Sequence, residues 1–208
     1  MIDQSTLVTY LVILLGFVFI PGPAVLLTLA RATSCGTKVG ISTGLGIAFG
    51  DLIHTLMAVF GLSAVILTSA FLFNLIKYAG AAYLVYLGIR AILEKTGLQA
   101  GPGAIRIEPG QAFRQAIVAE VLNPKSALFF LAFLPQFVKP ENGAVMLQLA
   151  SLGVLFVAMG FLSTLVVSVC AGPVGAFLRR NPAFLRWQGK VVGGIYCGLG
   201  LRLALQER

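Results

Sequence analysis

Charge is scarce in this sequence. Only 11% of its 208 residues are charged, while 58% are hydrophobic, and the mean hydropathy is +0.96. Soluble domains instead average about 25% charged residues and about 45–50% apolar ones. The composition therefore excludes a soluble globular domain and predicts an integral membrane protein that is surrounded by lipid.

Cysteine and histidine are almost missing. The chain has three widely separated cysteines, Cys35, Cys170 and Cys197, and a single histidine, His54. Such spacing fits neither a disulfide framework nor a metal centre, so we expect small packing residues, no metal site and no cofactor. The sequence also lacks a zinc-binding spacing, a nucleophile elbow and a pair of facing aspartates. We therefore assign no catalytic residue and expect no enzyme.

Acidic residues are fewer than basic ones, 7 against 15. In a membrane protein this excess of basic residues indicates topology. The sequence has no basic segment interleaved with aromatic residues, so we expect no nucleic-acid partner. The connections after the first, third and fifth apolar stretches carry Arg31, Lys38, Arg90, Lys95, Arg106, Arg114, Arg179, Arg180, Arg186 and Lys190. The opposite side carries Lys77, Lys139, Arg202 and Arg208. The positive-inside tendency thus predicts a cytoplasmic linker at 94–111 and both termini outside.

Long apolar stretches are what the chain has in abundance. About 20 apolar residues cross a bilayer, and six such spans are predicted at about 5–30, 39–67, 72–93, 112–138, 143–178 and 183–205. The first stretch lacks a basic leader and a cleavage site, so we expect it to be retained. The polar connector 94–111, rich in Gly and Pro, separates repeat one (1–93) from repeat two (112–208) within a single transmembrane domain (1–208).

The two halves resemble each other. Pro23 and Pro124 each interrupt the first span of their half, and Gly80-x-x-Tyr83 matches Gly193-x-x-Tyr196 in the third spans. Chance similarity between apolar helices is the alternative. Three spans per half make the second half enter the membrane from the opposite side. We therefore predict an all-α membrane protein whose six helices form two inverted three-helix repeats, with helices 1 and 4 broken at their prolines.

Both breaks carry candidate substrate-binding residues. Two prolines in Pro21-Gly22-Pro23 remove backbone donors from the first span. The fourth span holds Glu120, Asn123, Pro124 and Lys125, polar groups that are costly at membrane depth unless they face a cavity. Half-helix starts after Pro23 and Pro124, with Lys125, suit a carboxylate, while Glu120 suits an ammonium or a cation. Alternatively, Pro124 only kinks the helix and Lys125 reaches toward the membrane surface.

Three further side chains lie at membrane depth. Asp51 and His54 are three residues apart on one helical face, and with Glu120 they are candidates for binding a coupling ion. A structural partner of Lys125 or His54 is the alternative for Asp51, and a hydrogen-bonded packing residue is the alternative for His54. Tyr83 is a candidate cavity-lining residue because a buried hydroxyl needs a partner.

Four motifs follow one another along nearly the whole chain. They are Pro21-Gly22-Pro23, GLGIAFGD at 44–51, GAAYLVYLG at 80–88, and Asn123-Pro124-Lys125 followed by FFLAFLPQF at 129–137. Together they resemble the LysE/RhtB family of bacterial amino-acid exporters. The resemblance implies a six-helix, multi-pass protein of the bacterial inner membrane that exports amino acids or their derivatives on a proton or sodium gradient. The RhtB side, with homoserine, threonine, leucine and similar neutral solutes, is more similar than the lysine and arginine side.

Two other kinds of transporter share parts of this pattern. A transmembrane thiol carrier needs a cysteine in the first span of each half, and Cys35, Cys170 and Cys197 are not placed there. An ion or metal exporter, or a channel-like permease of the same fold, would use the same acidic residues as ligands. Glycine-rich faces are compatible with intramolecular packing and with a homodimer alike.

Overall fold

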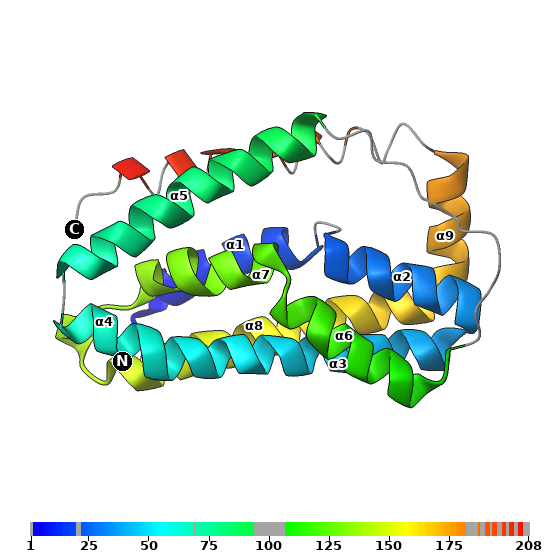
Figure 1. Ribbon diagram of the computed structural model, residues 1–208, viewed down its shortest axis with the longest axis horizontal. Helices are drawn as coiled ribbons and strands as arrows, with labels where there is room; N and C mark the ends of the chain where they lie inside the picture. The colour runs from blue at the N-terminus through cyan, green and yellow to red at the C-terminus, as the bar shows by residue number, and fades with distance from the viewer. Residues whose placement is uncertain are drawn as a thin grey trace.

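The computed structural model describes residues 2–19, 22–68, 70–93 and 107–181, and separate positions between 187 and 205. Every regular element in these residues is helical (Figure 1), which confirms the all-α prediction for this part of the chain. Pro21, most of the linker 94–111 and much of the predicted sixth span at 183–205 lie outside the described residues.

The elements follow the predicted spans, except that the structure divides the predicted fifth span, 143–178, at Cys170 into two helices. The first half contains α1 (Gln4–Phe19), α2 (Pro23–Cys35), α3 (Thr37–Met57), a π-helical turn (Ala58–Leu62), α4 (Ser63–Thr68) and α5 (Ala70–Leu93). The second half contains α6 (Pro109–Val121), α7 (Pro124–Leu128), a π-helical turn (Phe129–Phe133), two 3₁₀ turns (Leu134–Phe137 and Pro140–Asn142), α8 (Val145–Val169) and α9 (Ala171–Arg180).

Helix length and hydropathy allow up to five membrane spans among the described residues. Three continuous segments qualify, at Thr37–Val65, Phe71–Arg90 and Val145–Val169. Two bent pairs add one span each if each pair is counted together, since α1 and α2 meet at 48° and α6 and α7 at 45°. The sixth span and the inverted relation of the two halves stay predictions.

The breaks lie where proline predicts them. Gly22, in an extended conformation, precedes α2, and Pro23 occupies the first turn of that helix. On the other side, α6 ends before Asn123, whose side chain accepts the Lys125 backbone N–H at 3.0 Å and so caps α7, with Pro124 in the first turn. Proline tolerates the first turn of a helix but not its interior. Each predicted broken helix is therefore observed as two helices.

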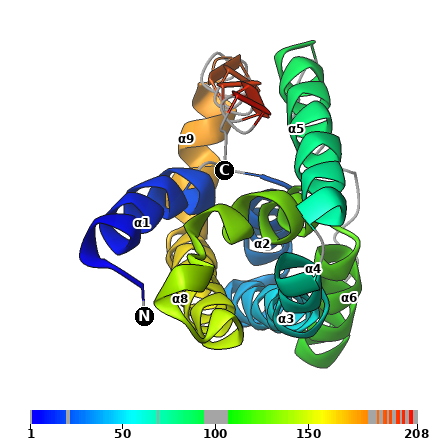
Figure 2. The same cartoon turned by 90° about the vertical axis from the view of Figure 1, so that its left-hand side faces the viewer.

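Helix α3 lies at the centre of one layer. Figures 1 and 2 show α3, α6 and α8 gathered on one side of the molecule and α5 on the other, with α1, α2 and α7 between them. A Cβ atom on Gly50 would lie 2.6 Å from Glu120 Cβ, and one on Gly44 would lie 2.7 Å from Thr164 Oγ1. The glycines of α3 thus allow α6 and α8 to approach its backbone, so this glycine-rich face serves packing within the chain.

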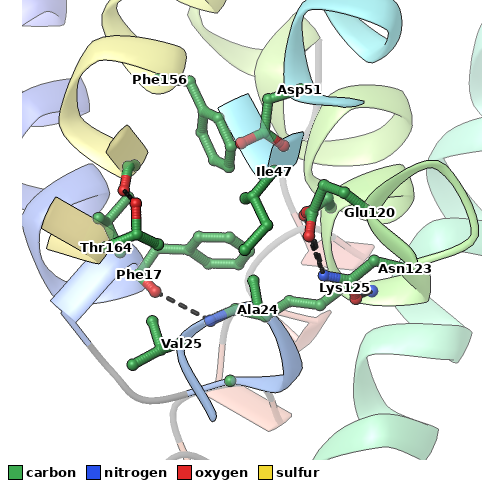
Figure 3. A pocket seen from close by; sticks show the side chains of 14 residues that line it. Phe17, Ala24, Val25, Ile47, Asp51, Glu120, Asn123, Lys125, Phe156 and Thr164 are labelled. Carbon is green, nitrogen blue, oxygen red and sulfur yellow. Dashed lines mark hydrogen bonds between the residues drawn. The ribbon is translucent and has the colours of Figure 1, made fainter. Parts of the chain in front are cut away.

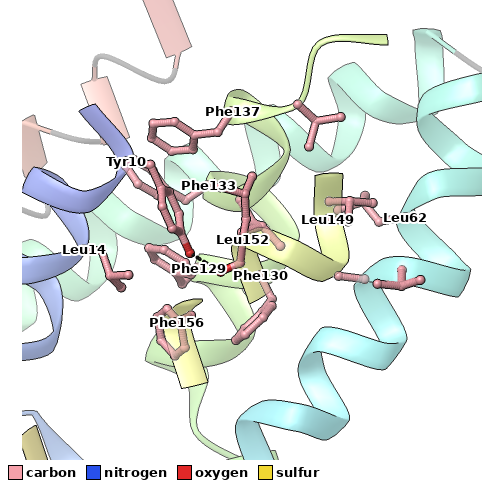
Figure 4. Packing of buried hydrophobic residues seen from close by; sticks show 14 of the residues in the cluster. Tyr10, Leu14, Leu62, Phe129, Phe130, Phe133, Phe137, Leu149, Leu152 and Phe156 are labelled. Atoms are coloured by element: carbon pink, nitrogen blue, oxygen red, sulfur yellow. Dashed lines mark hydrogen bonds between the residues drawn. The ribbon is translucent and has the colours of Figure 1, made fainter. Parts of the chain in front are cut away.

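An aromatic core fills the space between α1, α8 and the segment after α7. Figure 4 shows its rings, with Phe129 and Phe156 4.5 Å apart and Tyr10 and Phe137 5.1 Å apart between centroids. The buried Tyr10 hydroxyl donates to the Leu152 carbonyl at 2.7 Å, so its polar group is satisfied. The aromatic run of the fourth span serves packing. Three residues of this core, Phe17, Val18 and Phe156, also line a small cavity.

Candidate functional site

A small cavity lies where the two breaks meet α3 and α8. Its volume is about 40 Å³, enough for a few water molecules. Figure 3 shows the residues that line it: Phe17, Val18, Gly22, Ala24, Val25, Ile47, Asp51, Glu120, Asn123, Lys125, Ser126, Phe156, Gly160 and Thr164. One wall is apolar, while acidic, basic and amide groups from α3 and the second break form the other.

The structure brings five of the predicted site residues into this one cavity. These residues are Gly22, Asp51, Glu120, Asn123 and Lys125. On an unbroken helix Glu120 and Lys125 would point about 140° apart. Because α6 and α7 meet at 45° across the break, both face the same space.

The other predicted residues have different places. Pro23 and Pro124 begin α2 and α7 beside the cavity. Tyr83 is not among the residues that line it; its ring lies 5.7 Å from that of Tyr86 on α5. His54 contacts the second break from the side of α3.

The Glu120 carboxylate is held by its own break. Its two oxygens accept hydrogen bonds from Asn123 Nδ2 at 3.1 and 3.2 Å. Ser126 Oγ donates a third hydrogen bond to Oε1. Glu120 is only 2% exposed, and hydrogen bonds of this kind favour the ionised carboxylate. These three hydrogen bonds fix the position of the Glu120 carboxyl group at the cavity wall.

Lys125 reaches across to the first break. Its Nζ donates to the Phe17 carbonyl at 3.0 Å and lies 4.3 Å from the centre of the Phe17 ring. In a continuous helix the Phe17 carbonyl would accept the N–H of the residue four positions later. That residue is Pro21, which has no N–H. The ammonium thus replaces a donor that proline removes.

His54 has the same relation to the second break. Its Nε2 lies 3.1 Å from the Glu120 carbonyl oxygen, which also accepts the Asn123 backbone N–H at 2.9 Å. Because a carbonyl only accepts, Nε2 carries the hydrogen. The residue four positions after Glu120 is Pro124, again without an N–H. The imidazole is held in place by stacking on Phe130, with centroids 5.5 Å apart.

Asp51 differs from Glu120 in its surroundings. It is 2% exposed, and Oδ1 has no hydrogen-bond partner among the residues that the structure describes. Its carboxyl group interacts with that of Glu120 and with the Lys125 ammonium. The same described residues contain no group of three His, Cys, Asp or Glu side chains placed to hold a metal ion. The cavity thus combines two carboxyl groups with one ammonium.

Sequence comparison places this arrangement in a known family. The model of the LysE type translocators matches residues 15–207. The chain belongs to this family. It is a multi-pass membrane protein and a transporter, not an enzyme.

Several relatives cover nearly the whole translocator. A leucine efflux protein of Salmonella typhimurium is 33% identical over 94% of this chain and 93% of its own length. The membrane protein YrhP of Bacillus subtilis is 31% identical over 97% of this chain and 100% of its own length. A membrane protein of Vibrio cholerae is 28% identical over 97% and 98%. No solved structure matches the chain significantly.

Sequence reasoning missed part of the translocator's cavity. Phe17, Val25, Ile47 and Phe156 form its apolar wall, and Ser126 binds the Glu120 carboxylate. The apolar residues resemble ordinary lipid-facing residues in sequence, so only their packing identifies them. A usable signal existed for Ser126, since a hydroxyl two residues after Pro124 lies in the first turn of the new helix.

Proposed function

We propose that this translocator is a secondary active transporter that exports neutral amino acids across the bacterial inner membrane in exchange for protons. The observation that carries the proposal is the meeting of Asp51, Glu120 and Lys125 in one cavity between two broken helices. Buried ionisable groups at membrane depth mark ion and substrate pathways. The relatives named leucine efflux protein support an amino-acid substrate.

The charges of the cavity complement a zwitterion. Lys125 provides a positive pole for the substrate carboxylate. A Cβ on Gly22 would lie 2.9 Å from Lys125 Nζ, so this pole adjoins the start of α2, whose dipole also favours an anion. Asp51 and Glu120 provide the negative pole for the substrate ammonium. Both backbone charges of a free amino acid thus find partners.

The apolar wall accommodates the side chain of the substrate. Phe17, Val25, Ile47 and Phe156 present hydrocarbon to the cavity, and burying an aliphatic side chain against such a surface is favourable. A lysine or arginine side chain would leave its charge without a partner there. We therefore propose aliphatic, uncharged amino acids such as leucine as the preferred substrates.

The observed cavity is smaller than such a substrate. At about 40 Å³ it holds a few waters and no leucine, so the proposed cycle requires the two breaks to open. Alternating access in repeat-built transporters moves one repeat against the other around a midplane site. With the termini outside, as the charge bias predicts, the part of the aromatic core that surrounds Tyr10 on α1 lies on the extracellular side of the cavity.

The proton gradient is the proposed driving force because Asp51, Glu120 and His54 are the titratable candidates at the cavity and its edge. Counterflow of radiolabelled leucine into proteoliposomes tests the proposal. Unlabelled neutral amino acids on the inside should drive uptake, and divalent metals should not. If a divalent metal shows counterflow with its own isotope while leucine shows none, an ion exporter would be favoured instead.

A further inference from the structure

Besides the Lys125 ammonium, three titratable side chains lie at or beside the cavity, and the structure separates their roles. We propose that Asp51 alone binds and releases the coupling proton, while Glu120 remains an ionised carboxylate and His54 remains a neutral hydrogen-bond donor. This inference rests on the proposed function, and it deepens that function by assigning the proton to one residue of the same site.

The hydrogen-bond partners of the two carboxyl groups distinguish them. Glu120 accepts hydrogen bonds from the Asn123 amide and the Ser126 hydroxyl, so its negative charge is stabilised inside the protein. Asp51 is equally buried, but its Oδ1 has no partner among the described side chains and backbone groups. Its side-chain hydrogen bond is with the Glu120 carboxyl group, which accepts when Glu120 is ionised and Asp51 holds the proton. A buried carboxyl group with too few donors is more stable in its protonated form than in its ionised form.

Charge balance in the cavity gives the same assignment. The charged and titratable groups described as interacting with Asp51 are Glu120 from α6, Lys125 from α7 and Tyr10 from α1. From α2 and α8 the cavity receives only uncharged residues, Ala24, Val25, Phe156, Gly160 and Thr164. One ammonium neutralises one carboxylate. With Glu120 ionised against Lys125, the second carboxyl group is neutral only when it holds a proton.

We assign His54 a structural role and not proton binding, because its side chain already makes two contacts. Its Nε2–H donates to the Glu120 carbonyl, and its ring is packed on Phe130. The neutral Nε2–H tautomer makes both contacts and needs no further proton for them. The imidazole is therefore a positioning residue that fixes the end of α6 and, through it, the Glu120 side chain.

The assignment of the proton to Asp51 explains how one amino acid is exchanged for one proton without any other titratable group. When the substrate ammonium binds, it replaces the proton on Asp51, and Asp51–COOH becomes Asp51–COO⁻ as one proton leaves to the cytoplasm. When the amino acid departs outside, one external proton binds the carboxylate and restores Asp51–COOH. One proton thus enters for each amino acid exported, and no electrons move. A carrier that holds neither a proton nor an amino acid has an ionised Asp51 without a partner for its charge. This disfavours the return of the empty carrier to the form that faces the cytoplasm.

Proton release on substrate binding tests the assignment directly. Purified protein in weakly buffered detergent solution is mixed with L-leucine while a pH dye records released protons and a separate isotope assay records bound leucine. Wild-type protein should release one proton per bound leucine at a pH where Asp51 starts protonated. His54→Gln should release the same number. Wild-type protein that binds leucine without releasing a proton overturns the proposal, whereas protein that binds no leucine contradicts the proposed function instead.

Infrared difference spectra between acid and alkaline buffer give a readout that needs no substrate. A protonated carboxylic acid gives a carbonyl-stretch band. The band of a buried group that does not exchange with bulk water should be present in wild-type protein and in Glu120→Gln, and absent in Asp51→Asn. If Asp51→Asn fails to fold, Glu120→Gln still decides the matter. Loss of the band in Glu120→Gln would assign the proton to Glu120 and overturn the proposal.

Discussion

The Lys125 ammonium lies 3.0 Å from the carbonyl oxygen of Phe17, the residue four positions before Pro21. His54 Nε2 stands in the same relation to Glu120, four positions before Pro124. At each break, then, a side chain from another helix supplies the hydrogen that proline lacks. The Lys125 contact gives the Phe17 carbonyl a donor at the break, and the His54 contact adds a second donor to the Glu120 carbonyl, which already accepts the Asn123 N–H. Because backbone carbonyls need donors in a lipid environment, both contacts stabilise the bent form of the helices.

The charges on the two sides of the break depend on each other. Lys125→Ala removes the only cation that interacts with the acidic pair among the described residues, and a buried charge left without its partner costs roughly 3–5 kcal/mol. We expect Lys125→Ala and Glu120→Gln each to abolish export, and the double variant to accumulate better than Lys125→Ala alone. Membrane abundance and export rate of the three variants are the measurements. Normal export by Glu120→Gln would remove Glu120 from the site.

The role of His54 predicts a graded loss of stability. His54→Leu removes one of two donors to the Glu120 carbonyl and should lower the free energy of unfolding by about 1 kcal/mol. His54→Gln retains an N–H donor and should recover most of that loss together with export activity. Thermal unfolding in detergent compares the two variants. If both lose export equally while remaining stable, His54 acts in proton transfer and not as a cap.

Restoring the backbone donors should straighten the first span. In a Pro21→Ala, Pro23→Ala double variant the new N–H at position 21 can bond to the Phe17 carbonyl and displace Lys125. Alanine is well tolerated in helices, so membrane insertion should be unchanged while export is lost. A well-inserted double variant that exports at the wild-type rate would show that the break is not part of the site.

Close packing of α3 on α6 predicts a position-dependent glycine effect. Gly50→Ala would place Cβ 2.6 Å from Glu120 Cβ, and overpacking of this kind costs about 1–3 kcal/mol. Gly61→Ala is the matched control, since a Cβ there meets no atom within 4 Å. Melting temperatures should fall for Gly50→Ala and should stay unchanged or rise slightly for Gly61→Ala, because alanine is a better helix former than glycine. Equal melting temperatures would mean that α6 moves aside freely.

Local sequence patterns predicted the features that depend on single residue types. Proline predicted the two breaks, and the glycine-rich face of the second span indicated close helix packing, for which the structure supplies the partners α6 and α8. The cavity's apolar wall was not predictable because Phe17 and Phe156 come from helices whose packing partners are set by tertiary structure. Tyr83 was proposed from its chemistry alone, yet it lies on α5 outside the cavity lining.

The roles of His54 and Lys125 also required the three-dimensional arrangement. Their partners are the carbonyls of Glu120 and Phe17, 66 and 108 residues away in sequence. Nothing in the local sequence distinguishes a proton carrier from a donor to a distant carbonyl. The missing donors at Pro21 and Pro124 indicate that such partners are needed, but they do not identify them.

Simultaneous measurement of leucine and protons in proteoliposomes tests proton-driven export most directly. Vesicles containing the protein are loaded with labelled leucine and a pH-sensitive dye, and the external solution is made acidic. We predict that leucine leaves faster with the gradient than without it, that the interior acidifies in step with leucine loss, and that a protonophore abolishes the acceleration. Leucine efflux that ignores the pH gradient, survives the protonophore and stops without sodium would contradict the account.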